Sequence, residues 1–337
     1  MVKKNLFRGN ILVIGLGSIG ERHVRNLIKC GVTDISVLRR SDKKPRTISV
    51  SKFKTFFDLK SALKLKPEAA IIATPSSMHT IYLDKLIKNG IPTLIEVPIS
   101  NSLKNLNRIN NDAKKNKVPI LVGHNLKFHP ALKSIKKLVQ SNSLGKIFFS
   151  RSQFGEHLPD NHIWDNFKNR YEARADLGGG VILTSIHEID HAVWLFGKVK
   201  SVNCITKKSK FNLDVEDFAI IILEHKSGIT SEIQLDFISR AYVRSLQICG
   251  EKSYIDWIFK SNKVKFYNSQ RKKWQVVTKT KKSDVDQSYI EELKHFSDII
   301  YNNVKPLTSF ESSLHVLDVA LMSLKSGVNG KQIIIKS

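Results

Sequence analysis

A glycine-rich turn near the start of the chain constrains the fold more than any other feature. Gly15, Gly17 and Gly20 follow the apolar run ILVI and open a stretch with helical spacing. In such a strand–turn–helix unit, the first glycine permits a tight turn and the second lets a pyrophosphate approach the backbone. The third lets the helix pack against the strand, and the helix N-terminus offers its amides to phosphate. The sequence therefore predicts a dinucleotide-binding turn, with Ser18 and Ile19 inside it.

The segments after this turn alternate between apolar strands and amphipathic helices up to about residue 122. Strands are expected at 10–15, 34–39, 69–74, 92–97 and 119–123, and helices at 19–30, 78–89 and 102–116. Continuous apolar strands separated by helices are typical of a parallel sheet covered on both faces. Right-handed crossovers make such a sheet doubly wound. We therefore expect an α/β Rossmann domain over residues 1–123.

The second half of the chain has a different pattern. A helix at about 130–141 precedes a strand at 146–154, a polar loop from 155 to 176 and a helix at 181–196. Further strands are expected at 199–206, 216–225, 229–238, 243–249, 253–259 and 263–268, and helices at 287–302 and 310–326. Consecutive strands with short turns indicate a large, mostly antiparallel sheet. Residues 124–337 are therefore predicted to form an α+β domain.

The charge of the chain is strongly basic, with a formal net charge of +25. Such a charge suits nucleic acid, anionic membranes or acidic small molecules. The lysines are spread along the whole chain, however, which is typical of a solvated surface. We expect neither a nucleic-acid nor a membrane partner, and a phosphorylated or carboxylated substrate stays open.

The cysteines and the lengths of the apolar runs indicate the cellular compartment in which we expect the protein. Cys30, Cys204 and Cys249 are far apart and odd in number, so they predict no disulfide framework and favour a reducing cytoplasm. No apolar run approaches the roughly 18–20 residues that a membrane span needs. The N-terminal apolar stretch is broken by glycines, and we interpret it as a buried strand rather than a signal peptide.

The end of the second expected strand bears on cofactor choice. An acid there would hold the ribose of NAD, but the strand ends in Arg39 and Arg40, and the first acid is Asp42. Guanidinium groups pair well with a ribose 2′-phosphate, although both could be ordinary surface arginines. NADP is therefore favoured, and NAD stays open.

Several blocks together resemble the Gfo/Idh/MocA oxidoreductases. In the order of that family, they are GLGSIGERHVRNL, ATPSSMH, IEVP, GHNLKFHP and GGGVILTSIHEIDHAVWLFG. The stretch HLPDNHIWDNFKNRYEARADLGGG further resembles members found among cell-surface sugar biosynthesis proteins. The resemblance implies an open sheet in the second domain, often used for dimer or tetramer contacts. It also implies hydride transfer between NAD(P) and a hydroxyl carbon of a sugar, inositol or nucleotide sugar.

The resemblance also assigns residues. It implies that the loop at Thr74, Pro75 and Ser76 lies along the cofactor and that Glu96 lies near the nicotinamide. It also implies that the helix carrying His187 faces the substrate. The additional cofactor-side residues expected from these blocks are Thr74, Pro75, Ser76, His79, Glu96 and Val97.

One departure from the family pattern concerns chemistry. The family usually has Glu-Lys-Pro where this chain has Glu96, Val97 and Pro98, and valine can neither hold charge nor transfer a proton. The acid that commonly precedes the helix histidine is also missing, since Thr184 or Ser185 occupies that neighbourhood. A cofactor-binding sensor or regulator without turnover therefore stays an alternative.

Oxidation of an alcohol needs a base for the hydroxyl proton. His187 is the best remaining candidate, because imidazole titrates near neutral pH. Helical spacing places His187, Asp190, His191 and Trp194 on one face. Asp190 could orient an imidazole or bind a sugar hydroxyl, whereas His191 and Trp194 are expected to pack. His187 and Asp190 are thus the predicted catalytic pair, and His187 also the predicted substrate contact.

Further substrate contacts are expected from two polar segments. Trp164, Tyr171 and Arg174 suit sugar stacking and anion binding, although such residues also anchor long loops. Asn125 and Lys127 follow the last Rossmann strand, where the domains should meet and a pocket is expected. Ordinary loop polarity is the alternative for these two.

The run HEIDH, from His187 to His191, also matches the zinc motif H-E-x-x-H, with Glu216 as a possible third ligand. The motif is short and lies inside a block that already fits the oxidoreductases. A zinc hydrolase is therefore a remote alternative, and we expect no metal.

Overall fold

A computed structural model of the chain describes residues 6–40, 45–161, 165–209 and 211–336. It divides into two compact units, Met1–Asn125 with Asp286–Leu314, and Leu126–Val285 with His315–Ser337. The first boundary lies two residues from the expected one at 123/124. Residues 286–314 differ from the expectation, because they belong to the first unit rather than the second.

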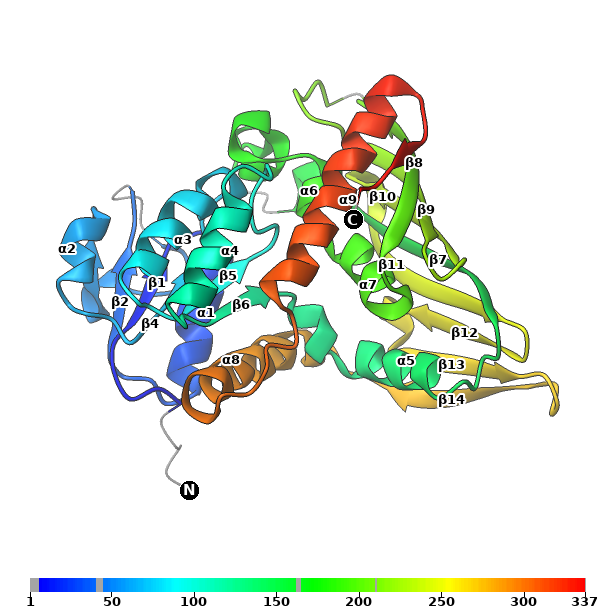
Figure 1. Cartoon of the computed structure of the whole chain (residues 1–337), viewed down its shortest axis with the longest axis horizontal. Coiled ribbons are helices and arrows are strands. Elements are labelled where there is room, and N and C mark those ends of the chain that lie inside the picture. Colours follow the sequence, from blue (N-terminus) through cyan, green and yellow to red (C-terminus); the bar gives the residue numbers. More distant parts are fainter. Residues whose placement is uncertain (1–5, 41–44, 162–164, 210, 337) are drawn as a thin grey trace. The chain divides into compact units, whose positions relative to one another are not determined.

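The first unit contains a six-stranded sheet with the order β3-β2-β1-β4-β5-β6 (Figure 1). Its strands are β1 (Ile11–Ile14), β2 (Ile35–Leu38), β3 (Lys54–Phe56), β4 (Ala69–Ile72), β5 (Thr93–Glu96) and β6 (Ile120–Gly123). All neighbours pair in parallel. The strand order reverses between β1 and β4, which confirms the doubly wound Rossmann fold. The short edge strand β3 was not predicted.

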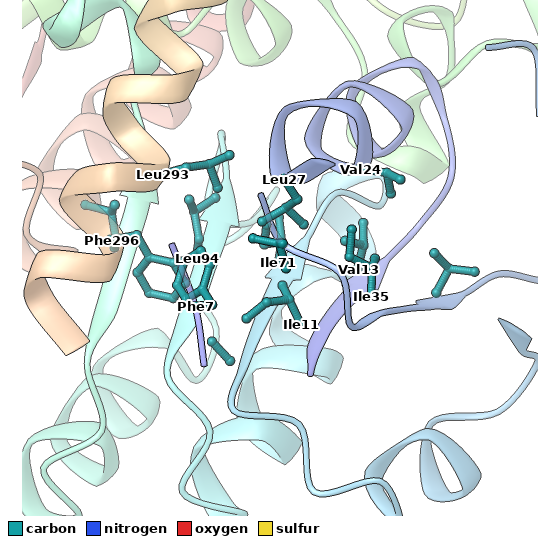
Figure 2. Packing of buried hydrophobic residues seen from close by; sticks show 14 of the residues in the cluster. Phe7, Ile11, Val13, Val24, Leu27, Ile35, Ile71, Leu94, Leu293 and Phe296 are labelled. Atoms are coloured by element: carbon teal, nitrogen blue, oxygen red, sulfur yellow. The ribbon is translucent and has the colours of Figure 1, made fainter. Parts of the chain in front are cut away.

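Helices cover this sheet and explain the discontinuous unit. They are α1 (Ser18–Lys29), α2 (Leu59–Leu63), α3 (His79–Lys88), α4 (Leu106–Lys115) and α8 (Asp284–Asn302). Leu293 and Phe296 of α8 join the same buried cluster as Leu94 of β5 and Phe7 (Figure 2). Each such side chain contributes roughly 1.5–3 kcal/mol on burial. This apolar face assigns α8 to the first unit.

The second unit contains a nine-stranded sheet with the order β14-β13-β12-β11-β7-β10-β9-β8-β15. Its strands are β7 (Ile147–His157), β8 (Val199–Lys207), β9 (Phe218–His225), β10 (Thr230–Asp236), β11 (Ile238–Gly250), β12 (Ser253–Ile258), β13 (Lys263–Asn268), β14 (Lys273–Lys279) and β15 (Ile333–Ile334). In the described part, β7 and β10 pair in parallel and the other neighbours are antiparallel. The mostly antiparallel α+β unit is confirmed, with β14 and β15 as additional strands.

The helices of this unit leave one sheet face open. They are α5 (Pro130–Gln140), α6 (Val181–Thr184), α7 (His187–Phe196) and the later part of α9 (Phe310–Asn329). The single helix expected at 181–196 is interrupted between α6 and α7. Ile222 and Ile205 point to the open face and are exposed, whereas their sequence neighbours are more buried. Among the described residues, no helix has the length and apolarity to span a membrane.

Candidate active-site residues

The glycine turn has the geometry that a dinucleotide requires. Gly15 has φ +95°, and a Cβ on Gly20 would lie 1.9 Å from the Gly15 carbonyl oxygen. A Cβ on Gly17 would meet no atom within 4 Å, so the space beside Gly17 is open. Gly17 is also the N-cap of α1 and makes no side-chain capping bond. The turn therefore leaves both space and the helix N-terminus, which holds Ser18 and Ile19, for a pyrophosphate.

The loop after β2 is fastened to α1. The Glu21 carboxylate accepts hydrogen bonds from the backbone N–H groups of Arg46, at 2.9 Å, and Thr47, at 2.7 Å. Arg39 is buried, whereas Arg40 is exposed and donates from Nη1 to Met78 Sδ at 3.2 Å. Arg40 thus lies between the end of β2 and the turn after β4. Asp42, the first acid after β2, lies outside the described residues.

The turn after β4 is linked to the turn after β5 by His79. Its Nε2 lies 2.7 Å from the Thr74 carbonyl oxygen and its Nδ1 lies 2.9 Å from that of Pro98. Burial lowers the pKa of His79, although both carbonyls favour the charged ring. A neutral ring donates to only one of the two carbonyls at a time. The buried Thr74 hydroxyl has no hydrogen-bond partner in the described part of the chain.

Two other predicted residues share this turn, and one follows β5. Pro75 is the N-cap of a 3₁₀ turn at Ser76–Met78, and Ser76 is buried. Val97 is half-buried and directly follows β5. The residues selected for the cofactor side therefore gather at the carboxyl ends of β1, β2, β4 and β5.

Glu96 at the end of β5 belongs to a buried polar cluster that the sequence did not reveal. Its Oε1 lies 2.6 Å from Nε2 of His23 on α1, and the His23 side chain is fully buried. The ring of Tyr289 on α8 meets His23 edge-on, with centroids 5.9 Å apart. Glu292, one turn further along α8, is also fully buried. The Glu21-Arg22-His23 run of α1 and the polar residues of α8 were the available signals, but only packing joins them.

In the second unit, Lys127 and Asp190 form a buried ion pair. Lys127 Nζ lies 2.8 Å from Asp190 Oδ1, and the side chains are 3% and 2% exposed. Lys127 Nζ also lies 5.7 Å from the centre of the Trp194 ring. Sequence reasoning selected Lys127 for substrate and Asp190 for catalysis, and the structure places them in one contact. Trp194, expected to pack, is half-buried and also meets this cation through its ring face.

Glu188 on α7 forms a second buried ion pair. Its Oε1 accepts from Nε and Nη2 of Arg244 on β11, at 2.9 and 2.8 Å, and its Oε2 lies 3.3 Å from His191 Nδ1. Burial raises the pKa of Glu188, but Arg244 and His191 outweigh it and lower this pKa to about 2. Arg244 carries no motif, so sequence reasoning missed it.

The zinc alternative finds no support in this geometry. Glu188 pairs with Arg244, and the Glu216 carboxylate accepts from the backbone N–H of Ile182 at 2.9 Å. Within residues 6–40, 45–161, 165–209 and 211–336, no three His, Cys, Asp or Glu side chains form a group that could hold a metal ion.

The remaining predicted residues lie on α7, directly after β6 and in the polar loop that precedes α6. His187 begins α7, is half-buried and stacks on His191, with ring centroids 6.4 Å apart. Asn125 is buried in the first unit and donates from Nδ2 to Ser288 Oγ at 3.0 Å. The predicted substrate contacts from the polar loop differ in exposure. Arg174 is exposed and pairs with Asp176, whereas Tyr171 is half-buried. Trp164 lies outside the described residues.

Comparison with known protein families accounts for both units. Residues 9–124 match the oxidoreductase family with an NAD-binding Rossmann fold, and residues 132–256 match the GFO/IDH/MocA C-terminal domain. The chain belongs to the Gfo/Idh/MocA oxidoreductase family. The resemblance drawn from the sequence blocks is thereby confirmed.

Individual family members are distant in sequence. D-apiose dehydrogenase from Paraburkholderia graminis is 26% identical over 176 residues, which are 50% of this chain and 44% of that protein. This chain therefore spans less than half the length of that relative. The NAD⁺-dependent scyllo-inositol 2-dehydrogenase of Bacillus subtilis is 23% identical over 333 residues, 94% of each chain.

A solved structure shows that the whole fold is shared. Levoglucosan dehydrogenase, in complex with NADH and levoglucosan, aligns with a TM-score of 0.86. The alignment covers 97% of this chain and 99% of that one at 15% identity. At this identity the likeness establishes the common fold of the family.

Proposed function

We propose that this chain is an NAD(P)-dependent dehydrogenase or reductase acting on a hydroxyl carbon of a sugar, nucleotide sugar or inositol-like compound. The observation that carries this proposal is the open glycine turn of Gly15, Gly17 and Gly20 in a member of this family. Relatives named for scyllo-inositol and D-apiose support a polyol or sugar substrate. When bound, the nicotinamide supplies or accepts the hydride.

We assign proton transfer to His187. Val97, beside Glu96, has no proton to exchange, whereas an imidazole gains and loses a proton near neutral pH. His187 begins α7 and is only half-buried, so its ring can be approached. In this proposal Asp190 acts on Lys127, holding the ammonium that it contacts at 2.8 Å. A lysine ammonium has three N–H donors, so Lys127 can donate to a substrate hydroxyl or carboxylate as well.

Asn125, Trp164, Tyr171 and Arg174 stay proposed substrate contacts. Arg174 and Tyr171 belong to short 3₁₀ turns in the loop that precedes α6, and Arg174 is accessible at the surface. Arg174 and Asp176 are both exposed, so the guanidinium can exchange the Asp176 carboxylate for an anionic substrate group. This is the reason for keeping anionic sugars among the candidates.

Turnover is the direct test of the enzyme proposal. The protein should be incubated with NAD(P)⁺ and a panel of polyols, aldoses, uronic acids and nucleotide sugars, and reduced nicotinamide followed by absorbance. We expect reduction with at least one compound class, abolished in Gly17→Val. Tight cofactor binding without turnover on any of them, in either direction, would favour the sensor or regulator suggested by Val97.

We propose NADP(H) as the preferred cofactor because of Arg39 and Arg40. Arg40 is exposed at the end of β2, on the side of the sheet expected to hold the adenosine ribose. A charge-assisted hydrogen bond contributes about 1.5–3 kcal/mol, which corresponds to roughly tenfold to hundredfold in affinity. Replacing Arg39 by Asp and Arg40 by Ser should weaken NADPH binding by this factor and spare NADH in a fluorescence titration. Equal affinities in the unmodified protein contradict the preference.

We also propose a homodimer or homotetramer through the open face of the second unit. Strand register aligns one row across five strands, from Phe149 through Cys249 and Tyr254 to Tyr267 and Trp274. Phe149 and Trp274 are 41% and 51% exposed. Exposed aromatic side chains of this kind are enriched at protein interfaces.

Light scattering tests this assembly. Trp274→Glu should lower the molar mass in solution, because it places a charge within the aromatic row. Ile81→Glu on α3 of the first unit replaces a residue that is 56% exposed and should leave the mass unchanged. A monomeric unmodified protein rules the oligomer out.

A further inference from the structure

Glu292 on α8 is a fully buried carboxyl group in the first unit. Its relative exposure is 0%, and neither carboxyl oxygen has a hydrogen-bond partner among the described residues. Taking an ionised carboxylate out of water without a partner costs several kcal/mol. The neutral carboxylic acid is therefore the form that this position stabilises.

The groups around Glu292 act in the same direction. Burial, followed by the charge of Glu96 on β5, raises the pKa of Glu292 well above its ordinary value. From α1, His23 holds Glu96, and the Arg22 guanidinium lies 4.9 Å from the Tyr289 ring centre. Tyr289 lies on α8 itself, and burial raises its pKa, so it stays neutral. His23 and Arg22 thus contact Glu96 and Tyr289 rather than Glu292.

This cluster includes Glu96, which ends β5 at the same edge of the sheet as the glycine turn after β1. The glycine turn follows β1 and the arginines follow β2, which places the adenosine half of a dinucleotide over that side of the sheet. The nicotinamide half of a dinucleotide bound there would extend past the strand-order reversal toward β4, β5 and β6. Glu96 stands at the carboxyl end of β5 and is 13% exposed. Only the oxidised cofactor has a positively charged nicotinamide ring in this half.

We propose that Glu292 is a proton-holding residue that couples binding of the oxidised cofactor to release of one proton. The O–H bond of the Glu292 acid breaks, its electron pair stays on the carboxylate, and the proton passes to solvent. The positive ring would stabilise a carboxylate on Glu292, which burial and the Glu96 charge disfavour in the free protein. The reduced ring is uncharged and gives no such gain. This inference rests on the proposed cofactor site.

Calorimetry of cofactor binding measures the coupling. NAD⁺ is titrated into the protein at one pH in two buffers with different ionisation enthalpies, and NADH is titrated in parallel. NAD(H) is used because the 2′-phosphate of NADP(H) would itself titrate at about pH 6. We expect up to one proton released with NAD⁺ and none with NADH. The NAD⁺ dissociation constant should fall by up to about tenfold per pH unit as pH rises.

Two substitutions on α8 form a matched pair. Glu292→Gln keeps the shape and cannot ionise, so it should abolish proton release and flatten the pH dependence of NAD⁺ affinity. Glu291→Gln, at the next position, removes a carboxylate that is 36% exposed and pairs with Lys294 at 2.9 Å. It should retain the proton release of the unmodified protein.

Infrared spectroscopy tests the starting state without any cofactor. At a pH above the raised pKa of Glu216, about 7, the unliganded protein should show the carbonyl band of a protonated carboxylic acid, absent from Glu292→Gln and present in Glu291→Gln. This band and the proton count of the unmodified protein decide the matter even if Glu292→Gln fails to fold. NAD⁺ binding without proton release, or release unchanged in Glu292→Gln, overturns this inference alone. Failure to bind either cofactor overturns the proposed function as well.

Discussion

The glycine turn of the first unit and helix α7 of the second are built in contrasting ways. The turn consists of backbone, with Gly15 at φ +95° and no room for a side chain at Gly20. Helix α7 instead depends on side-chain charges, through the buried pairs Lys127–Asp190 and Glu188–Arg244. The turn is formed by consecutive residues of the sequence. The ion pairs of α7 instead need partners from distant segments, η3 (Asn125–Phe128) and β11. The two should therefore respond differently to substitution and to pH.

The largest effect is expected in the turn. Gly17→Val should abolish detectable NAD(P)H binding, because the side chain fills the open space that a pyrophosphate needs. The variant should stay folded, since a Cβ on Gly17 meets no protein atom within 4 Å. Fluorescence titration measures binding, and circular dichroism measures folding. Normal titration would mean that the cofactor site is misplaced.

Gly20→Ala is the matched control for this prediction. Its Cβ would lie 1.9 Å from the Gly15 carbonyl oxygen, so this smaller substitution should disturb the fold itself. Unchanged stability of Gly20→Ala would show that the turn is less rigid than its backbone contacts indicate.

The next effect concerns turnover from α7. His187→Asn should lower the saturated rate roughly a hundredfold to ten-thousandfold, the usual contribution of a general acid–base. Cofactor affinity should be unchanged, because the turn is in the other unit. The pH profile of the unmodified enzyme should contain a group titrating near neutrality that disappears in the variant. Unchanged saturated turnover would assign His187 to substrate positioning and direct attention to Lys127 or Tyr171.

The free energy of unfolding should depend on the buried ion pair Lys127–Asp190 in the second unit. Lys127→Met leaves Asp190 buried without its cation and should cost about 3–5 kcal/mol. The double variant Lys127→Met with Asp190→Leu should recover most of this loss, because two apolar side chains replace the buried pair. Denaturant unfolding of both variants measures the difference. Equal stability of the single and double variants would show that the pair is not coupled.

The smallest effect is the pH dependence of Glu216, beside α6. Burial raises the pKa of Glu216 from 4.5 to about 7, against the opposing hydrogen bond from Ile182 N–H. Because the folded state binds this proton more tightly, its contribution is complete below pH 4.5 and is lost as pH rises to about 7. Stability should fall there by up to about 1.4 kcal/mol per pH unit.

Glu216→Gln should make this slope shallower in plots of unfolding midpoint against pH, because the raised pKa of Glu292 contributes the remainder. Glu232→Gln, whose carboxylate is 37% exposed and paired with Arg151, serves as control and should keep it. An unchanged slope in Glu216→Gln assigns the dependence to another group.

The parts predicted well from sequence are those with a local signature. Strands β1, β2, β4, β5 and β6 lie within their expected ranges, because continuous apolar runs between helices have few other folds. The edge strands β3 and β14 were missed, since Lys54 and Lys273 begin segments in which no residue is fully buried. The break between α6 and α7 was also missed, because the apolar spacing continues across it.

By itself, the sequence determined the doubly wound sheet, the glycine turn and the family, because each is recorded in the order and spacing of nearby residues. Only the tertiary structure decided that α8 joins the first unit and that Glu188 meets Arg244. It alone brought His23 to Glu96 and Glu292 into the same cluster. These contacts join residues 56 to about 200 positions apart, and no local pattern records them. Burial makes an unpaired charge costly, so packing rather than spacing selects the partner or the protonation state of each group.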